Sequence, residues 1–578
     1  MSRTLHRHRM HRRAVVAFLL LILPGACASN LLESSFQNDQ KGREVAIGES
    51  LTGKYLAGRH ALVVREMDKA ATYLGAALDM APEEISLINQ TFTLYISEGR
   101  FDQAALLAPK ILADDPGAPI PTLFTVVEAF HKGDFQAALQ AIDTLPNGGM
   151  KSYMSPLLQA WAVYGQENQT DKAIKKLEPL QKAGLKALFH LHSAIVLDVA
   201  GSTELAAKSY REAIRQQGGM TMRTAQLLGN LYTRSGQMAK AADVYKEHGI
   251  TSPNSPLPDW AARQIEEGKP QKAEITTPAD GAAEAFLNVA TSFNQQNARD
   301  MALAFSRMGL RLKPDFPVMH MLLGNILQAQ DRLESANKAY DAIEASSPYS
   351  WPTRLRSAEN LNDLGQTDEA ERILLAMAAE RQDIPDPLIR LGDIFRGHER
   401  FSDAAEIYQD AFQRINKVEP HHWTLLYAHG IVLERSKQWP KAEEKFLSAL
   451  ELSPDQPYVL NYLGYSWIDQ GINLDKGMEM IKRAVELRPT DGYIIDSLGW
   501  VHYRLGEYDD AVKQLERAIV RRPEDAIIND HLGDAFWRVG RLTEAKFQWR
   551  HALTLKIDDD KLRKTIEDKL VNGLTEAD

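Results

Sequence analysis

A spacing of about 34 residues recurs along this chain. One small residue, Gly or Ala, returns once in each unit of the second half, and we call its place the marker position. The marker residues are Ala290, Gly324, Ala358, Gly392, Gly430, Gly464, Gly499 and Gly533, evenly spaced except for a longer interval after Gly392. Such a period indicates one structural unit copied along the chain, and each copy buries its apolar face by stacking on the next.

Other residue types keep constant distances from the marker. In the unit of Gly430 they are Ala442, Phe446 and Pro454, and equivalent residues follow the other markers. A small residue at the marker and at the alanine lets two helices approach closely, and the aromatic ring fills the gap beside their crossing. Proline then ends the second helix and sets the turn to the next unit. The pattern therefore predicts a series of packed helix pairs.

These coupled positions resemble the tetratricopeptide repeat, whose pattern is W-x2-L-G-x2-Y…A-x3-F…P within each repeat. The resemblance implies an all-α fold, an α-solenoid whose helix pairs form a superhelix with a concave groove lined by the first helix of each pair. The first half of the chain repeats more loosely, and the residues at the marker position there are Gly58, Phe92, Val126, Trp161, Ala194 and Gly229. Together the two halves give about fourteen units.

The repeat divides the chain into segments. They are an export signal at 1–27, a linker at 28–50, an N-terminal array at 51–249, a Pro-rich joint at 250–282, a C-terminal array at 283–556 and a capping helix with tail at 557–578. Five prolines crowd the joint, where one short helix around Trp260 is expected, and a degenerate repeat that keeps the solenoid continuous is the alternative. Leu562, Ile566 and Leu570 fit a terminal helix that covers the last repeat with one apolar face.

The N-terminus has the pattern of an export signal. Five arginines and no acidic residue precede an apolar run from Ala14 to Leu23, and small residues follow it. The exit resembles a bacterial lipobox, with Gly25 and Ala26 before Cys27, although Pro24 replaces the usual leucine. Cys27 is therefore the candidate lipid anchor.

Cleavage after Ala28 at an A-x-A site is the alternative, and it would release a soluble periplasmic protein. The location expected from these features is the cell envelope of a Gram-negative bacterium. By resemblance to bacterial lipoproteins, Ala28 after the cysteine favours the outer membrane, facing the periplasm. Contact with the membrane is expected through the lipid anchor only.

Composition and motifs exclude several classes of function. A single cysteine excludes a disulfide framework and cysteine-based metal sites, and the net charge of −10 gives little support for a nucleic-acid partner. The chain has no H-E-x-x-H motif, Walker A loop or G-x-S-x-G elbow. His190 and His192 point to different sides of a helix, and His421-His422 follow a proline at a turn. We expect no catalytic residue, no metal ligand and no cofactor, and hence no enzyme.

Candidate partner-binding residues lie on the first helices of the most regular repeats. They are Tyr458, Asn461, Tyr465, Asp496, Trp500, Tyr503, Asp530, Asp534 and Trp537. Aromatic rings beside carboxylates suit an extended or helical peptide with apolar and basic side chains. The alternative is that the aromatic residues are core, because large apolar side chains are mostly buried. No repeat carries the Lys and Asn pair of the carboxylate-clamp type of tetratricopeptide domain, so recognition of a chaperone C-terminus is not expected.

The second half also resembles a group of proteobacterial tetratricopeptide lipoproteins, through the runs 461–467, 496–500 and 531–534. One member of that group binds a periplasmic carboxy-terminal processing protease and delivers cell-wall hydrolases to it. The resemblance implies a lipoprotein adaptor with proteins or peptides as partners. A structural component of an envelope machine for polysaccharide export, pilus biogenesis or outer-membrane assembly is the alternative. A cytoplasmic enzyme or enzyme regulator is disfavoured by the export signal.

Overall fold

The computed structural model describes residues 49–267, 272–557 and 559–575. In these ranges the chain forms the helices α1 to α30 and one short 3-10 helix, with no strand. The export signal, the candidate anchor Cys27 and nearly all of the predicted linker lie outside the described residues. Within the ranges given, no helix is both long and apolar enough to cross a membrane.

The first part of the chain forms six helix pairs, which we call the first array. They are α1 Leu51–Val63 and α2 Met67–Leu78, α3 Ile85–Ser97 and α4 Phe101–Asp114, α5 Pro119–His131 and α6 Phe135–Asp143, α7 Lys151–Glu167 and α8 Thr170–Lys182, α9 Lys186–Val199 and α10 Thr203–Gln217, and α11 Met222–Arg234 and α12 Met238–Thr251. A single helix, α13 Leu257–Glu266, follows and contains Trp260.

Eight further pairs follow. The first two, which we call the inserted helices, are α14 Pro278–Gln295 with α15 Arg299–Leu312 and α16 Pro317–Ala329 with α17 Leu333–Asp341. The remaining six form the second array: α18 Ser350–Asp363 and α19 Thr367–Glu380, α20 Asp386–Gly397 and α21 Phe401–Gln413, α22 Trp423–Arg435 and α23 Trp439–Leu452, α24 Pro457–Asp469 and α25 Leu474–Leu487, α26 Gly492–Arg504 and α27 Tyr508–Arg521, and α28 Ala526–Arg538 and α29 Leu542–Thr554. The turn η1 Pro420–His422 precedes α22, and α30 Asp560–Asn572 ends the stack.

The predicted repeat phase and the number of helix pairs are confirmed. Every residue at the marker position lies on the first helix of a pair, and the alanine equivalent to Ala442 lies on the second. These alanines are all 0% exposed: Ala70, Ala104, Ala138, Ala173, Ala206, Ala241, Ala302, Ala336, Ala370, Ala404, Ala442, Ala511 and Ala545. The unit of Gly464 has Gly477 instead, and a Cβ added to Gly464 would lie 2.7 Å from the carbonyl oxygen of Gly477. In that unit the two small residues mark where the helices of the pair cross, whereas the marker glycines Gly324, Gly392 and Gly430 pack against Tyr340, Tyr408 and Phe446 of the second helix.

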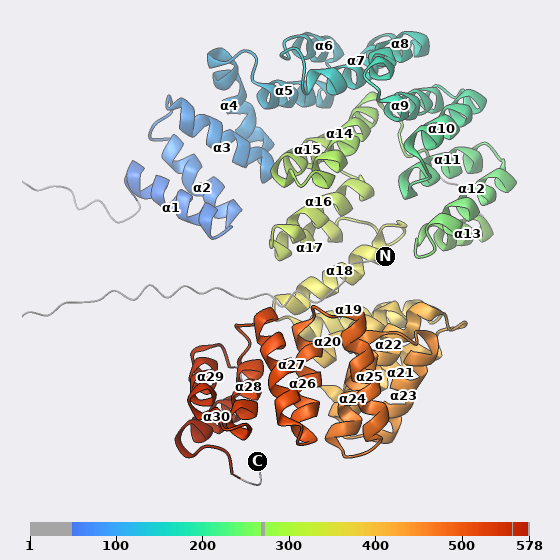
Figure 1. Ribbon diagram of the computed structural model, residues 1–578. Helices are drawn as coiled ribbons and strands as arrows, with labels where there is room; N and C mark the ends of the chain where they lie inside the picture. The colour runs from blue at the N-terminus through green and yellow to red at the C-terminus, as the bar shows by residue number, and fades with distance from the viewer. Residues whose placement is uncertain (1–48, 268–271, 558, 576–578) are drawn as a thin grey trace, which may run out of the picture.

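The inserted helices lie inside the curve of the first array. Figure 1 shows α14 to α17 between α1–α6 on one side and α9–α13 on the other, and α15 contacts α3 and α5 while α14 contacts α7 and α9. One continuous apolar core runs from Ala61 on α1 to Tyr340 on α17. The first array and the inserted helices therefore form one packed body.

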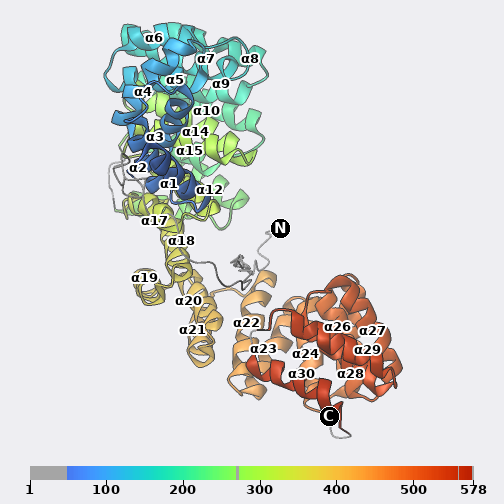
Figure 2. The same ribbon diagram turned by 90° about the vertical axis from the view of Figure 1, so that its left-hand side faces the viewer.

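The second array lies apart from that body and curves around a face of its own. Figure 2 shows α18 and α19 leading from the packed body to α20–α30. Its apolar core consists of separate clusters that pass from repeat to repeat, as expected when each unit contacts only its neighbours. Helix α13 also contacts the link between α17 and α18, since Trp260 Nε1 donates a hydrogen bond to the Ser346 carbonyl at 2.7 Å. The two parts of the chain therefore differ in packing although they share one repeat.

Candidate partner-binding groove

The nine candidate residues occupy comparable places on three neighbouring helices. Three lie on each of α24, α26 and α28, at three and four residues' spacing within each helix. That spacing places them along one face of each helix, and the three helices are the first helices of consecutive pairs. We call this face of the second array the groove. The following contacts determine which of the nine side chains face a partner and which are engaged within the chain.

A polar ladder connects the first helices across the groove. The Asn461 side chain donates to Ser497 Oγ at 3.1 Å, and His531 Nδ1 lies 3.0 Å from an Asp496 carboxylate oxygen. Each of these contacts joins one first helix to the next. Asn461 and Asp496 therefore fix the stacking of α24, α26 and α28, and only part of each side chain is left for a partner.

An aromatic stack lies beside the Asp496–His531 contact. The Trp500 ring lies between Tyr503, at 4.7 Å and 11°, and His531, at 4.0 Å and 20°. Burial alone would lower the pKa of His531, but the charge and hydrogen bond of Asp496 outweigh burial and raise it. Tyr503 is buried and accepts a hydrogen bond from Arg538 Nε at 3.2 Å. Trp500 remains half-buried and presents one edge of the stack.

Three candidates at the end of the groove are engaged by the capping helix. Lys569 of α30 donates to Asp530 at 2.8 Å and to Asp534 at 2.7 Å. Asp534 also accepts from Trp549 Nε1 at 2.9 Å, and burial together with Asp530 raises its pKa to about 6 against the opposing effect of Lys569. The Trp537 ring packs on Gly573, where an added Cβ would lie 2.1 Å from it. In this structure the capping helix is the partner of Asp530, Asp534 and Trp537.

A row of partly exposed apolar side chains borders the groove. Tyr458 and Tyr465 are half-buried, whereas Tyr493 is 52% and Ile527 48% exposed. Tyr458, Tyr493 and Ile527 stand at the same distance before their markers, so they repeat along one edge. The sequence reasoning missed Tyr493 and Ile527, although their shared distance from the marker was the signal that could have identified them.

Arginines flank this row. The Arg488 guanidinium lies 5.6 Å from the centre of the Tyr458 ring, and Arg522 lies 4.9 Å from that of Tyr493. Both arginines come from the end of the second helix in the same pair. The repeated contact holds each ring at the edge of the groove with one face covered.

Carboxylates continue along the first helices beyond the nine candidates. Tyr462 OH donates to Glu434 at 2.9 Å, and Asp469 pairs with Arg504 at 2.7 Å. On α18, at the start of the second array, burial raises the pKa of Glu359 although Arg390 lies 2.9 Å from it. The groove thus combines aromatic rings with acidic side chains over several repeats.

The concave side of the first array differs, because the inserted helices cover it. Arg332 and Glu98 form an ion pair of 2.7 Å with side chains 6% and 7% exposed, and Arg311 Nε donates to Glu128 at 2.9 Å. In both pairs the arginine belongs to the inserted helices or the turn between them, and the acid belongs to the first array.

The contact of the inserted helices with the later helices of the first array is also buried. Arg223 of α11 pairs with the fully buried Glu284 of α14 at 2.8 Å, and a Cβ added to Gly281 would lie 2.2 Å from the Trp161 ring. The concave side of the first array therefore holds a segment of the chain itself.

The histidines noted in the sequence serve local structure. His192 is buried, accepts from Trp161 Nε1 at 3.2 Å, and has its pKa lowered to about 3 by burial. His422 accepts from the Glu419 backbone N–H at 2.8 Å within the turn before α22. Over the described part of the chain, no group of three or more His, Cys, Asp or Glu side chains is arranged to hold a metal ion.

Comparisons with known proteins agree with the repeat architecture. The tetratricopeptide repeat profile matches residues 389–457 and 497–549. A TPR repeat-containing protein of Pseudomonas aeruginosa is 31% identical over 192 residues, which is 33% of this chain and 32% of that protein. The BBSome complex member BBS4 of Bos taurus is 31% identical over 109 residues, 19% of this chain and 20% of that protein. The chain thus matches about a third or less of the length of these relatives.

Two solved structures are similar over most of the chain. The Cut9–Hcn1 hetero-tetramer of the APC/C has 16% sequence identity and a TM-score of 0.36, covering 91% of this chain and 97% of that one. Yeast Tom70 has 14% identity and a TM-score of 0.32, covering 90% and 96%.

Proposed function

We propose that the protein is a non-enzymatic scaffold that captures partner proteins in the groove of its second array. The reason is that the chain belongs to the tetratricopeptide-repeat family. The observation that carries this proposal is the groove itself. The rings of Tyr458, Tyr465, Tyr493 and Trp500 are partly exposed there. Tyr465 lies near the carboxylates of Asp469 and Asp496, and Tyr493 lies near that of Asp525. Aromatic anchors with acidic neighbours suit a segment with apolar and basic side chains, either extended or helical.

The first array supports this assignment of partner chemistry. Its concave side holds helices of the chain itself, and Arg311 and Arg332 of that segment pair with Glu128 and Glu98. Beside α3 and α5, an acidic part of the concave surface binds arginine-bearing helices of the chain itself, whereas on the other side Arg223 of α11 binds Glu284 of α14. The acidic part is an internal example of what carboxylates of the second array can bind from outside. The electrostatic match also disfavours acidic partners, because like charges brought together are repelled.

We further propose that the scaffold works in the bacterial cell envelope. The basic and apolar segment at 1–26 supports export, and Cys27 supports a lipid anchor at the outer membrane, with soluble release after Ala28 as the alternative. If the protein is an adaptor, its partners are a periplasmic protease and cell-wall hydrolases. If it is a structural component, its partners are components of an assembly or export machine.

Capture from envelope extract tests the groove and the partner class together. The bait is the protein without residues 1–26, and the comparison variant is Tyr458→Ala/Tyr493→Ala. The matched control is Tyr55→Ala/Tyr73→Ala, which removes two exposed tyrosines from α1 and α2. We expect the groove variant to lose the captured proteins and the control to retain them. Full capture by the groove variant would overturn the groove assignment.

The identity of the captured proteins then separates the two readings. A protease together with cell-wall hydrolases supports the adaptor, and a stable set of membrane-machine components supports the structural role. The location has its own test: Cys27→Ser should abolish membrane association and leave folding unchanged. A Cys27→Ser protein that still sediments with membranes would contradict the lipid anchor.

A further inference from the structure

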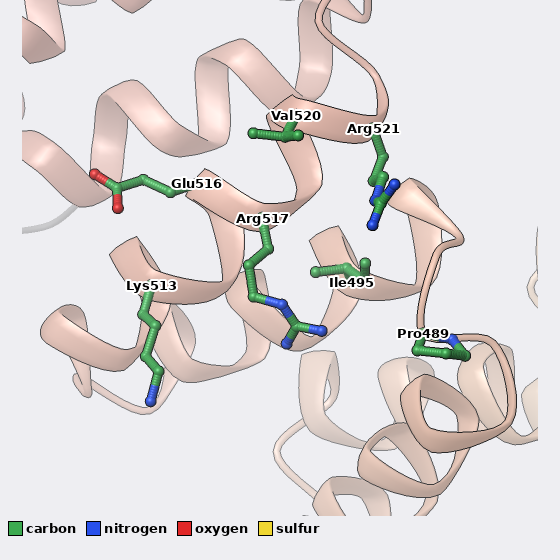
Figure 3. A pocket seen from close by; sticks show the side chains of 7 residues that line it. All are labelled: Pro489, Ile495, Lys513, Glu516, Arg517, Val520 and Arg521. Atoms are coloured by element: carbon green, nitrogen blue, oxygen red, sulfur yellow. The ribbon is translucent and has the colours of Figure 1, made fainter.

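A basic pocket lies between α26 and α27, on a different helix face from the groove. It is an open depression of about 280 Å³, and Figure 3 shows the side chains that line it. Lys513, Arg517 and Arg521 of α27 supply three cations at successive intervals of four residues. Intervals of four place them along one stripe of the helix, and Figure 3 shows Arg517 and Arg521 on either side of Ile495 with Lys513 further along the helix.

The pocket also has an apolar part. The buried side chain of Ile495 and the ring of Pro489 line it beside Arg521, and Val520, which is 75% exposed, stands at its rim. The cations therefore surround a surface that can contact the uncharged part of a ligand. A group bound here meets positive charge and apolar carbon together.

None of the three cations has a carboxylate partner within the described ranges. Arg517 donates to the Gln514 amide oxygen, and Lys513 and Arg521 form no ion pair with any residue that the structure describes. Glu516 is the acid at the pocket, and it binds Arg541 at 3.0 Å, while Figure 3 shows its carboxylate directed away from Arg517. The pocket is therefore positive on a chain whose net charge is −10.

The three cations of this stripe are exposed, and no ion pair with a described residue holds them in place. Like charges four residues apart on a helix repel one another and disfavour the helix. Most other arginines of the second array are paired, such as Arg483 with Asp455 at 3.0 Å and Arg504 with Asp469 at 2.7 Å. Three exposed cations that lack an ion-pair partner among the described residues lie beside this open pocket, and their charge suits an anionic ligand from outside the chain.

We propose that this pocket binds a phosphate monoester. Two guanidinium groups offer paired N–H donors that match the oxygens of phosphate, and the ammonium of Lys513 adds a third positive charge. Three cations suit a group with about two negative charges better than a single carboxylate. Pro489, Ile495 and Val520 contact the carrier of the phosphate, and the volume admits a carrier the size of a sugar. This proposal is independent of the groove.

The phosphate can belong to a soluble sugar phosphate or to a lipid headgroup, and two probes distinguish these sources. Glucose 6-phosphate represents the soluble ester and is measured by titration calorimetry against glucose. Vesicles of phosphatidylcholine with phosphatidic acid represent the headgroup and are measured by co-sedimentation against pure phosphatidylcholine. Binding of one probe over its control supports the pocket and assigns the source.

The variant Lys513→Gln/Arg517→Gln/Arg521→Gln tests the residues. We expect binding to weaken on the order of 100-fold, from about a factor of five for each cation near an anionic group. The matched control is Lys175→Gln/Lys176→Gln/Lys182→Gln on α8, which removes three exposed cations elsewhere. The control should bind as the unchanged protein does. Equal weakening in both variants would mean that net charge alone is responsible and would overturn the pocket.

A single substitution checks that the cavity matters. Val520→Glu places a carboxylate at the rim on an exposed side chain, so folding is unaffected while phosphate is repelled. We expect loss of binding at least as large as for one cation. Unchanged binding in Val520→Glu, or no binding of either probe by the unchanged protein, would contradict the proposal. So would stronger binding of poly-glutamate than of either phosphate probe.

Discussion

The first and second arrays are built from the same repeat but use their concave sides differently. In the first array, α14–α17 fill the concave side, and ion pairs such as Arg332–Glu98 are buried there. In the second array the corresponding face carries the rings of Tyr465 and Trp500 at half burial. The repeat thus determines how helices pair, whereas the side chains between the fixed positions determine what the superhelix holds.

The largest effect is expected when one charge is removed from the buried contact between the first array and the inserted helices. Arg223→Leu leaves the Glu284 carboxylate buried without its cation, which we expect to destabilise the packed body of the first array and the inserted helices by about 4 kcal/mol. Denaturant unfolding followed by a probe on α7 measures the loss. Arg211→Leu, which breaks the exposed pair with Glu247, is the control and should change stability by less than about 1 kcal/mol. Equal losses would show that the inserted helices are not held by this pair.

A smaller steric change should separate the inserted helices from the first array. Gly281→Ala directs a methyl group into the fully buried Trp161 ring, and overpacking of this kind destabilises by about 3 kcal/mol. Gly397→Ala is the control, because nothing lies within 4 Å of a Cβ there. Thermal unfolding of both variants measures the difference. An unchanged melting temperature in Gly281→Ala would contradict the close contact of α14 with α7.

Loss of the ion pairs with the capping helix α30 should destabilise only the end of the second array. Lys569→Met leaves Asp530 and Asp534 buried without a cation, and we expect a loss of about 2 kcal/mol confined to α28–α30. Amide hydrogen exchange resolves the site of the loss. Lys564→Met, on the exposed side of α30, should leave exchange unchanged. Faster exchange in the first array as well would mean that the two parts are coupled.

The two arrays should respond oppositely to pH. Burial lowers the pKa of His192 to about 3, so the unfolded chain binds its proton first, and stability of the first array falls as pH drops below 6.5. One unit below 6.5 the expected loss is about 1.4 kcal/mol. The pKa of His531 is raised, so its contribution is complete below 6.5 and is lost as pH rises through the raised value.

Unfolding curves between pH 5 and pH 8, read by probes in each array, measure both trends. His192→Gln should flatten the acid side for the first array, while His131→Gln, on the exposed end of α5, should leave it unchanged. His531→Gln should flatten the alkaline side for the second array. The same slope in both arrays would contradict the opposite environments of the two histidines.

Substitutions at the edge of the groove should have the smallest effect on stability. Tyr493 is more than half exposed, so Tyr493→Ala should change the free energy of unfolding by less than about 0.5 kcal/mol. Partner capture should nevertheless fall, which distinguishes a contact residue from a packing residue. Tyr503→Ala provides the contrast, since that ring is buried in the stack with Trp500 and should lower stability. A large stability loss in Tyr493→Ala would identify the ring as packing.

The sequence predicted the pairing of helices because the repeat signal is local. Gly499 and Ala511 lie close together in the sequence and belong to the two helices of one pair, α26 and α27, so their spacing is sufficient. The filling of the first array was not predicted, because Arg332 and Glu98 are 234 residues apart and nothing in the period distinguishes α16 and α17 from other pairs. Long-range complementarity of this kind has no periodic signature.

The candidate site was predicted in part for the same reason. The spacing placed Asp530 and Asp534 on the first helix of the last pair, but their cation, Lys569, lies on the helix after the last repeat. The sequence pattern identified residues at four positions relative to the marker, and at the position of Tyr458 it did not identify the equivalent Tyr493 and Ile527. Comparing each position across all units, instead of within one, identifies the exposed edge.

The inserted helices also have a mechanical consequence. A stack of helix pairs stretches like a spring, since each pair touches only its neighbours and small rotations add up along the stack. In the first array α14 and α15 connect opposite sides of the coil, through α3 and α5 on one side and α7 and α9 on the other. Under tension between the two ends of the chain, that coil transmits force as a stiff block. The extension should then be taken up by α18–α29, so that pulling changes the curvature of the groove and leaves the first array unaltered.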